Sequence, residues 1–307
     1  MEDGVIQKAI RLMESDFQVI TLTAVAEKLY LTPSYLSHLF KHLTGKSFVE
    51  HLTEIRIKEA KKLLLETGMK NYEISDVIGY QNARYFSQMF KKHVGLLPNE
   101  FRSVAVSVYH KLKRMFIEGE FVSGQTLFVS ETAERLAVSQ DVVREALVIL
   151  EKEGLFTTYR NEGTTVSDIT VKDIRDAFEL RELIEGYAVR EVMKTLKSSD
   201  VLYLDKLLEN MDVAVQEDNS YRMIELDMNF HEFFYVRCSN EAVLKTWKSI
   251  KNKIMRFNAM TNKGYTNEGL RLNHTKLKAV IQSGDVNYTV RQFIEHMQGY
   301  RRFKDPI

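Results

Sequence analysis

Apolar side chains recur three and four positions apart along most of the chain, and this spacing predicts amphipathic helices. Near the start of the chain the pattern occurs twice in the same order, at an offset of about fifty residues. Each copy predicts a short helix, a tight turn and a second helix. The second helices contain the matching runs Tyr35-Leu36-Ser37-His38-Leu39-Phe40-Lys41 and Tyr85-Phe86-Ser87-Gln88-Met89-Phe90-Lys91.

Capping residues support this interpretation of the repeat. In the first copy, Thr32 is a candidate N-cap and Pro33 stands at the first helical position, where its missing N–H costs nothing. In the second copy, Gly79 marks the turn and Asn82 is the candidate cap. The spacing predicts that these helices bury Leu36, Leu39, Phe40 and Leu43, and Phe86, Met89 and Phe90. Between the copies a connecting helix is predicted over 48–66, with Arg56, Lys58, Lys61 and Lys62 on its outside.

The stretch from Leu22 to Arg102 resembles the AraC-type DNA-binding domain. The resemblance is carried by the repeat itself, by Ala60-Lys61-Lys62-Leu63-Leu64, by Ile78-Gly79-Tyr80 and by Pro98-x-x-Phe101-Arg102. It implies a domain at residues 1–103 whose two recognition helices enter successive major grooves. The candidate DNA contacts are Tyr35, His38, Lys41, Arg84, Gln88 and Lys91. For Tyr35, packing at the start of its helix is an equal alternative.

A second module of different pattern follows. A helix is predicted from near Val106 to Gly119, a second after Ser130, and a third over 140–153. The period then changes, and β-favouring runs at 155–159 and 164–166 flank Arg160-Asn161-Glu162-Gly163, which predicts a hairpin. Three helices followed by a hairpin indicate a winged helix.

This second module resembles the GntR-type winged helix. Ala133-Glu134-Arg135-Leu136-Ala137, Val143-Arg144-Glu145-Ala146-Leu147 and Gly163 carry the resemblance, which implies a domain at 104–169. It also implies that Arg135, Gln140 and Arg144 contact DNA, and that Gly163 lets the wing approach the minor groove. Gln140-Asp141-Val142 departs from the family pattern of Arg, a small residue and Pro, and places a negative charge near DNA. A dimerising spacer that does not bind DNA is therefore the alternative.

Residues 170–307 show helical periodicity throughout, and this indicates an antiparallel bundle. The predicted helices lie at 172–197, 199–216, 220–238, 241–260, 270–282 and 286–303. The chain is thus predicted to be mainly α, with a double helix-turn-helix, then a winged helix with a small β-hairpin, then an all-helical bundle.

Four residues of the bundle can bind a metal ion. Asp227 and His231 are four apart and share one helix face. His274 and His296 lie at similar distances before and after the turn at 283–285, about 16 Å away along each helix, so antiparallel packing brings them level. One carboxylate and three imidazoles suit Zn²⁺, with coordination positions left for water or a ligand. Hydrogen-bonded core histidines are the alternative.

The bundle resembles the FCD ligand-binding domain of the FadR subgroup of GntR regulators. Asp227-x-x-x-His231, His274, His296 and the first-helix run Phe178-Glu179-Leu180-Arg181 carry this resemblance. It implies that the four residues hold a divalent ion, with Zn²⁺ favoured and Ni²⁺ and Mn²⁺ as alternatives, and that a small organic acid completes the shell. Arg181 is the candidate partner for the acid's carboxylate. A salt bridge from Arg181 to Glu185, one turn on, is the alternative.

Composition narrows the functional class. The 307 residues, 44% hydrophobic and 28% charged, allow two or three folded domains, and the net charge of +1 does not itself indicate nucleic-acid binding. The acidic start does not resemble a secretory signal, and neither a membrane span nor a cysteine pair is present, which predicts a cytoplasmic protein without a membrane partner. Tyr235 stands where H-E-x-x-H requires its second histidine, so a zinc protease is excluded.

These observations predict a transcription regulator and not an enzyme. Its expected partners are a double-stranded DNA operator, a small organic acid effector and a second copy in a homodimer, with RNA polymerase as a further candidate. The alternative is a DNA-bridging protein that senses nothing and uses the bundle only to dimerise.

Overall fold

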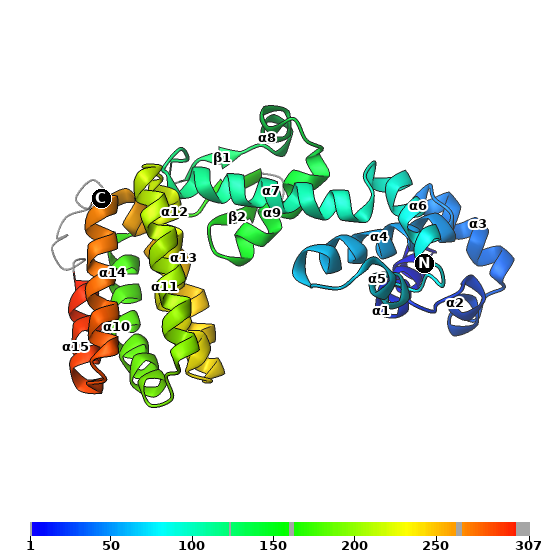
Figure 1. Ribbon diagram of the computed structural model, residues 1–307. Coiled ribbons are helices and arrows are strands. Elements are labelled where there is room, and N and C mark those ends of the chain that lie inside the picture. Colours follow the sequence, from blue (N-terminus) through cyan, green and yellow to red (C-terminus); the bar gives the residue numbers. More distant parts are fainter. Residues whose placement is uncertain (1, 123, 160–162, 262–265, 299–307) are drawn as a thin grey trace. The chain divides into compact units, whose positions relative to one another are not determined.

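The computed structural model describes residues 2–122, 124–159, 163–261 and 266–298. Contacts divide the chain into two compact units: Met1–Tyr109 with Ala133–Ala146, and His110–Thr132 with Leu147–Ile307. Helices make up most of both units, and a small antiparallel sheet is the β-structure of the described part (Figure 1). The mainly-α class predicted from the sequence is confirmed.

The first unit contains the repeated helix-turn-helix. Its first six helices are α1 (Glu2–Asp16), α2 (Leu22–Lys28), α3 (Pro33–Thr44), α4 (Phe48–Glu66), α5 (Asn71–Val77) and α6 (Ala83–Val94). The pairs α2–α3 and α5–α6 are the two copies, and α4 connects them. The sequence pattern did not predict α1, which buries Ile6, Ala9 and Met13 in the core around the first copy.

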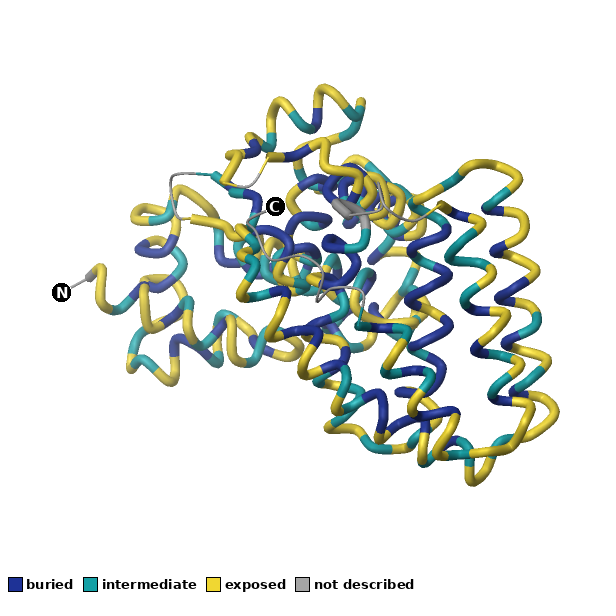
Figure 2. The backbone as a smooth tube through the Cα atoms, turned by 90° about the vertical axis from the view of Figure 1, so that its left-hand side faces the viewer, coloured by how far each residue is buried: buried dark blue, intermediate teal, exposed yellow. Residues whose placement is uncertain are grey.

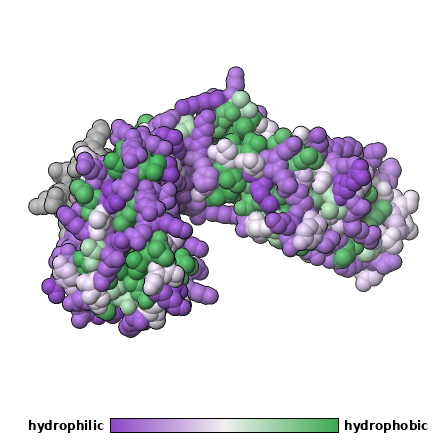
Figure 3. All heavy atoms as spheres, viewed as in Figure 1, coloured by the Kyte–Doolittle hydropathy of each residue, from purple (hydrophilic) through white to green (hydrophobic). Residues whose placement is uncertain are grey.

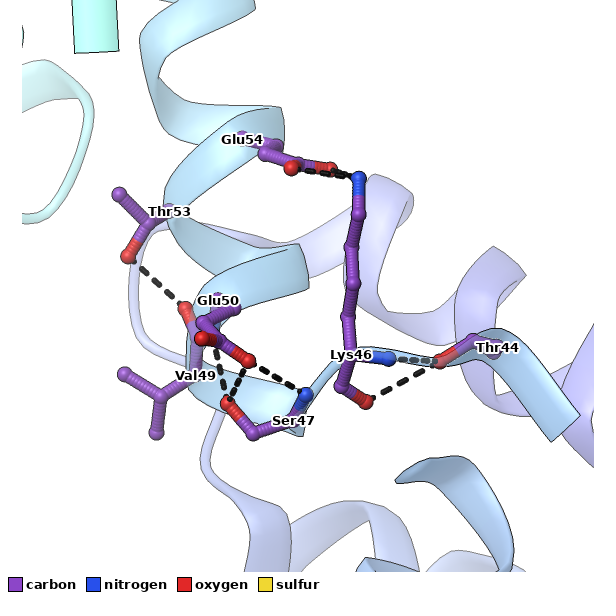
Figure 4. Close-up of polar contacts among 7 residues, drawn as sticks. All are labelled: Thr44, Lys46, Ser47, Val49, Glu50, Thr53 and Glu54. Carbon is purple, nitrogen blue, oxygen red and sulfur yellow. Dashed lines mark hydrogen bonds and ion pairs between the residues drawn. The ribbon is translucent and has the colours of Figure 1, made fainter. Parts of the chain in front are cut away.

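The start of α4 is stabilised by hydrogen bonds and an ion pair between residues close in sequence. Ser47 and Glu50 form a capping box, in which Ser47 Oγ accepts from the Glu50 N–H and the Glu50 carboxylate accepts from the Ser47 N–H (Figure 4). Lys46 pairs with Glu54 one turn further along, at 2.6 Å. These contacts satisfy N–H groups that would otherwise lack partners at the start of the helix.

The turn of the second copy requires glycine. Gly79 has a φ of +83°, and a Cβ at this position would lie 2.0 Å from the Gln18 carbonyl oxygen. Arg56 fixes the same place, because its guanidinium donates to the carbonyls of Phe17 at 2.9 Å and Gln18 at 3.1 Å. The prediction that Arg56 lies on the outside of α4 was therefore wrong.

Two further burial predictions need correction. Leu43, predicted to be buried, lies in the last turn of α3 and is 37% exposed, while Leu36, Leu39 and Phe40 are buried as expected. Met89 is only partly buried beside Phe86 and Phe90. At Leu43, near the end of a short helix, the apolar stripe runs beyond the core, and at both positions spacing alone overestimates burial.

Helix α7 (Pro98–Ile117) runs without a break through the position where a new helix was predicted to begin, near Val106. Proline at its first position and the lack of any later glycine or proline before Gly119 explain this continuity. The last AraC-type helix and the first winged-helix helix are therefore one element, and the prediction that a new helix begins near Val106 was wrong.

The winged-helix elements are α8 (Val129–Leu136), α9 (Gln140–Lys152), β1 (Thr126–Leu127), β2 (Phe156–Tyr159) and β3 (Gly163–Val166). The sheet order is β1-β3-β2, with both pairs antiparallel. The hairpin β2–β3 was predicted, whereas the two-residue strand β1 was not. The wing tip, Arg160 to Glu162, lies outside the described residues.

The bundle consists of α10 (Val171–Met193), α11 (Ser198–Gln216), α12 (Ser220–Arg237), α13 (Glu241–Thr261), α14 (Asn267–Gln282) and α15 (Val286–Met297). Each begins and ends within a few residues of its prediction, except that the last predicted helix extends beyond the described residues. Helix α10 packs on α12, α13 and α15, and α11 packs on α12 and α14. Figure 2 shows buried and exposed positions interleaved along the helices of the chain, and α12 is buried on most of its circumference.

The surface of the bundle mixes polar and apolar side chains (Figure 3), and its exposed large apolar residues include Leu183, Leu202 and Val236. Within the described residues, no helix combines the length and apolar character that crossing a membrane requires.

Helix α13 joins the bundle to the end of the winged-helix elements within the second unit. Arg256 donates to the Ser167 carbonyl at 2.7 Å, and its guanidinium lies 4.5 Å from the centroid of the Phe116 ring. Asn252 donates to the Glu153 carbonyl at 3.3 Å and to the Glu153 carboxylate at 3.1 Å. Within this unit, helix α13 thus contacts α7, the residue that follows α9 and the residue that follows β3.

Candidate metal centre and DNA-reading helices

The four predicted metal ligands lie together in the bundle. Asp227 and His231 come from α12, His274 from α14 and His296 from α15, and their ligand atoms all lie within 4.8 Å of one another. Asp227, His231 and His274 are buried, and His296 is partly buried. The antiparallel α14 and α15 place His274 level with His296, with ring centroids 5.1 Å apart.

Two of the imidazoles have the orientation that a metal ion requires. The Nδ1–H of His274 donates to the Leu270 carbonyl at 2.8 Å, and the Nδ1–H of His231 donates to the Glu185 carboxylate. Since carbonyl and carboxylate oxygens only accept, the neutral rings carry their hydrogens on Nδ1, and in that form both Nε2 lone pairs are available. Among the described residues, neither buried Nε2 has a hydrogen-bond partner.

The carboxylate of Asp227 completes this arrangement. Its Oδ1 lies 2.9 Å from His274 Nε2 and 3.6 Å from His231 Nε2, without the alignment of a hydrogen bond to either. Its Oδ2 accepts from the Asn258 side chain at 3.3 Å. Buried polar atoms that face one another without hydrogen bonds are costly, and a divalent ion between them would remove that cost. The residues present fit such an ion.

The electrostatics of the cluster favour the ionised form of the Asp227 carboxylate and the neutral form of the His296 ring. Burial alone would raise the pKa of Asp227, but His231 and His274 outweigh it and hold the pKa well below its usual range. Desolvation, and then His274 and His231, hold the pKa of His296 well below its usual range, so this ring is neutral at neutral pH. Burial lowers the pKa of His231, yet Glu185 and Asp227 outweigh burial and the net pKa is raised.

Arg181 is buried beside this cluster, and the predicted salt bridge to Glu185 is present. Arg181 Nε donates to Glu185 Oε2 at 2.8 Å, and the Tyr235 hydroxyl donates to the same oxygen at 2.8 Å. The guanidinium lies 5.5 Å from the centroid of the Trp247 ring. Among the described residues, the buried Arg181 Nη2 has no hydrogen-bond partner. The salt bridge therefore leaves part of the guanidinium available to an acceptor.

Sequence reasoning missed three residues around the site: Tyr235, Trp247 and Asn258. Tyr235 and Trp247 stack with ring centroids 4.4 Å apart, and Asn258 contacts Asp227 from α13. The one available signal was helical spacing, since Tyr235 follows His231 by one turn. Trp247 and Asn258 reach the cluster from a different helix, which spacing along one element does not reveal.

The predicted contacts of the double helix-turn-helix are exposed. On α3, Tyr35, His38 and Lys41 face solvent, and His38 and Lys41 line an open groove that Leu22 and Pro33 also border. On α6, the stripe Arg84, Gln88 and Lys91 is exposed. Asn82 caps this helix by accepting from the backbone N–H groups of Arg84 and Tyr85 at 2.8 and 3.1 Å.

The predicted contacts of the winged helix are also at the surface. Arg135 on α8 and Gln140 and Arg144 on α9 are exposed, and Arg144 donates to Gln140 Oε1 at 3.0 Å. Gly163 pairs with Tyr159 in the sheet, and a Cβ there would lie 3.1 Å from the Thr126 side chain. The tight packing of β1 on β3 is thus a structural reason for glycine at this position.

Comparisons with known proteins agree with this order of domains. Three family models match successive stretches: a helix-turn-helix domain at 25–103, the bacterial regulatory proteins of the gntR family at 104–166, and the FCD domain at 176–299. The chain is 29% identical over 155 residues to the uncharacterized HTH-type transcriptional regulator YdhC of Bacillus subtilis, covering 50% of this chain and 69% of that protein.

Other relatives match either end of the chain. Over 104 residues it is 38% identical to the uncharacterized transcriptional regulatory protein YesN of Bacillus subtilis, covering 32% of this chain and 28% of that protein. The solved structure of E. coli McbR/YncC aligns with a TM-score of 0.54 at 20% identity, covering 65% of this chain and 95% of that one. At this identity the alignment shows the fold alone.

The fold and these matches define a DNA-binding transcription regulator of the helix-turn-helix type. In particular, the chain is a regulator of the GntR type with an FCD domain, and it carries an AraC-type double helix-turn-helix in front of the winged helix. The match to the bacterial regulatory proteins of the gntR family and the relatives named as transcriptional regulators confirm the prediction of a regulator and not an enzyme.

Proposed function

We propose that this regulator binds a specific DNA operator under the control of a small organic acid, which binds at a divalent metal site in the bundle. The observation that carries the proposal is the convergence of His231 Nε2, His274 Nε2 and Asp227 Oδ1 in a buried space, without hydrogen bonds among them. His296 supplies the fourth ligand. Hydrogen bonds on both Nδ1 atoms hold the rings ready for an ion.

Three imidazoles and one carboxylate favour Zn²⁺, with Ni²⁺ and Mn²⁺ as alternatives. Such an ion supplies a Lewis acid that binds a carboxylate oxygen. Arg181 Nη2, which has no hydrogen-bond partner among the described residues, is the protein group that pairs with the acid, because guanidinium and carboxylate match in geometry and charge. Glu185 holds both Arg181 and His231, so it links the two parts of the effector site.

Helix α13 provides the route from this site to the winged-helix elements. Asn258 contacts the ligand Asp227, while Arg256 and Asn252 contact Ser167 and Glu153. A shift of α13 on effector binding would therefore change its contacts with Asp227 and with the winged-helix elements at Ser167 and Glu153. Such a switch operates only if the effector binds the two states with different affinity.

Regulators of this type bind DNA operators and commonly act as dimers. We extend the proposal to a homodimer that acts on chromosomal DNA in the cytoplasm, with RNA polymerase as a further partner. The alternative, a DNA-bridging protein with a bundle that only dimerises, leaves the buried Nε2 atoms of His231 and His274, which have no hydrogen-bond partner among the described residues, without an explanation.

The first test is the metal content of the purified chain by elemental analysis. We expect about one divalent ion per chain, retained in His93→Ala, whose ring is exposed on α6, and lost in His274→Ala/His296→Ala. Wild-type protein that stays free of metal after incubation with Zn²⁺ or Ni²⁺ would contradict the proposal.

The effector is sought by thermal unfolding of the Zn²⁺-loaded protein with mono-, di- and tricarboxylates. A ligand at a hundred times its Kd stabilises the folded state by about 2.7 kcal/mol. The acid that raises the melting temperature must also change the affinity for DNA, and it must fail to do so in the double histidine variant. A tightly bound acid without effect on DNA binding would favour the bridging alternative.

A further inference from the structure

One face of the winged helix's recognition helix is partly covered, although its Asp141 side chain remains 47% exposed. The segment Ala133–Ala146 belongs to the same compact unit as Met1–Tyr109, so the first turns of α9 pack with the AraC-type domain. Two stripes of side chains run along these turns. Gln140 and Arg144 form the exposed stripe, and Asp141 and Glu145, both partly buried, form the neighbouring one.

The second stripe contacts α4, the helix that connects the two helix-turn-helix copies. Lys61 Nζ lies 2.6 Å from Asp141 Oδ2, and the Lys61 side chain is only 13% exposed. The prediction that Lys61 lies on the outside of α4 was therefore wrong. Lys62, its neighbour, is 53% exposed and pairs with Glu59 on its own helix. The burial of Lys61 is thus specific to the side that meets α9.

Charge complementarity extends beyond this pair. Lys58 and Lys61 are three residues apart on α4 and present two positive charges, while Asp141 and Glu145 are four apart on α9 and present two negative ones. Burial raises the pKa of the Glu145 carboxyl, and Lys61 and Lys58 act against this rise, whereas Asp141 and Glu66 add to it. The Lys61 ammonium also lies 5.9 Å from the centroid of the Phe101 ring, which fixes its position on the AraC-type side.

We propose that the Asp141–Glu145 stripe is a docking surface for Lys58 and Lys61 of α4 in the same chain. This contact couples the two DNA-reading modules, so that they recognise one composite operator at a fixed spacing. It also gives a role to the acidic departure at Asp141. The contact does not mask the reader, because Gln140 and Arg144 stay exposed on the adjacent stripe. The proposal does not depend on the metal site.

Zero-length cross-linking of the full chain with a carbodiimide tests the contact directly, because this reagent joins only amines and carboxylates that touch. We expect Lys61 to be joined to Asp141 or Glu145, and the product to disappear in Asp141→Asn/Glu145→Gln. The exposed pair Lys46–Glu54, also at 2.6 Å, is the internal positive control. A product at Lys46–Glu54 without one at Lys61 would overturn the proposal. In a mixture of ¹⁵N-labelled and unlabelled chains, a Lys61 product that joins a labelled chain to an unlabelled chain would also overturn the proposal.

Charge reversal tests the coupling through thermal unfolding without DNA. Lys61→Glu should lower the melting temperature by about 3 °C more than Lys62→Glu. Lys61→Glu/Asp141→Lys should recover most of this loss. Equal effects of Lys61→Glu and Lys62→Glu, or a double variant no better than Lys61→Glu, would contradict the docking.

The functional consequence is tested on a DNA fragment selected by the wild-type chain from a randomised pool and footprinted to locate both contacted sites. Inserting about five base pairs, half a helical turn, between the sites should weaken wild-type binding about tenfold. The ratio of affinities for the two fragments should be smaller for Lys61→Glu than for wild type and Lys62→Glu. Each ratio compares one protein on two DNAs, so the change in net charge cancels. Equal ratios for all three proteins would overturn the coupling.

Discussion

At the scale of single residues, Glu185 organises the proposed effector site, and it is not one of the four candidate metal ligands. Its carboxylate accepts from Arg181, Tyr235 and the Nδ1–H of His231. Burial alone would raise the pKa of Glu185, but Arg181 and His231 outweigh it and hold the pKa at about 2. The carboxylate is therefore ionised at neutral pH and fixes the His231 ring with Nε2 turned to the other ligands.

Glu185→Gln should lower the affinity for Zn²⁺ about 10- to 100-fold, since this is the usual effect of removing a carboxylate behind a metal-binding histidine. Titration against a competing chelator measures this affinity. Glu179→Gln, on the exposed side of the same helix, is the matched control and should bind as wild type does. Because Glu185→Gln also removes the partner of buried Arg181, its melting temperature is measured alongside. A folded variant with unchanged Zn²⁺ affinity would rule out this positioning role.

The sequence predicted that Asp227, His231, His274 and His296 lie together, because all four are on helices whose register and antiparallel order fix their relative height. It did not predict the roles of Arg56 and Lys61. Periodicity places a charged residue on the polar side of its own helix, but the carbonyls of Phe17 and Gln18 and the carboxylate of Asp141 come from distant segments. Long basic side chains can reach such partners from the edge of a polar face.

At the scale of elements, the start of α10 is fixed by a capping box. Thr170 Oγ1 accepts from the Asp173 N–H at 3.1 Å, and the Asp173 carboxylate accepts from the Thr170 N–H at 3.1 Å and pairs with Lys253 of α13. The hydrogen bonds from the Thr170 side chain and backbone, and then Lys253, lower the pKa of Asp173 from 3.8 to about 2. This carboxylate therefore stabilises the folded chain in its ionised form.

Asp173→Ala should destabilise the chain by about 0.5 to 1 kcal/mol at neutral pH, a modest value because the side chain is partly solvated. The lowered pKa sets the pH window: the stabilisation is complete above about 4 and disappears as the pH falls toward 2. Urea unfolding between these limits measures the difference from wild type. Asp176→Ala, which removes an exposed pair with Lys172, should have a smaller effect. A difference that stays constant down to the acid end would contradict the assignment.

The elements that the sequence predicted best are those whose own chemistry marks both ends. Thr32 with Pro33, and Asn82, cap the second helices of the repeat as predicted. The missed elements lack such signals. The prediction of a new helix near Val106 followed a new apolar stripe, yet nothing in the sequence of α7 interrupts a helix. Strand β1 has two residues and forms only because β3 supplies a partner, so no local pattern announces it.

At the scale of the whole molecule, the question is whether both DNA-reading modules bind the same operator. Arg84 on α6 and Arg144 on α9 are exposed arginines of the two modules. If both contact phosphates or base edges in one complex, Arg84→Ala and Arg144→Ala should each weaken binding, and each lost phosphate contact should reduce the slope of log affinity against log salt by about 1. Arg291→Ala, an exposed arginine of α15, is the control for loss of one positive charge.

Arg84→Ala and Arg144→Ala are expected to lower the affinity for DNA by different amounts. Arg144 donates to Gln140 before DNA is bound, so binding must exchange that hydrogen bond for one to the operator. The net loss in Arg144→Ala is therefore expected to be smaller than in Arg84→Ala, with the same direction in the salt slope. Gln140→Ala separates the two roles of this pair: it should lower affinity if Gln140 reads a base, and raise it if Gln140 only restrains Arg144. An Arg144→Ala variant with unchanged affinity and salt slope would instead identify the winged helix as a spacer, and the α4–α9 contact would then serve to hold that spacer in place.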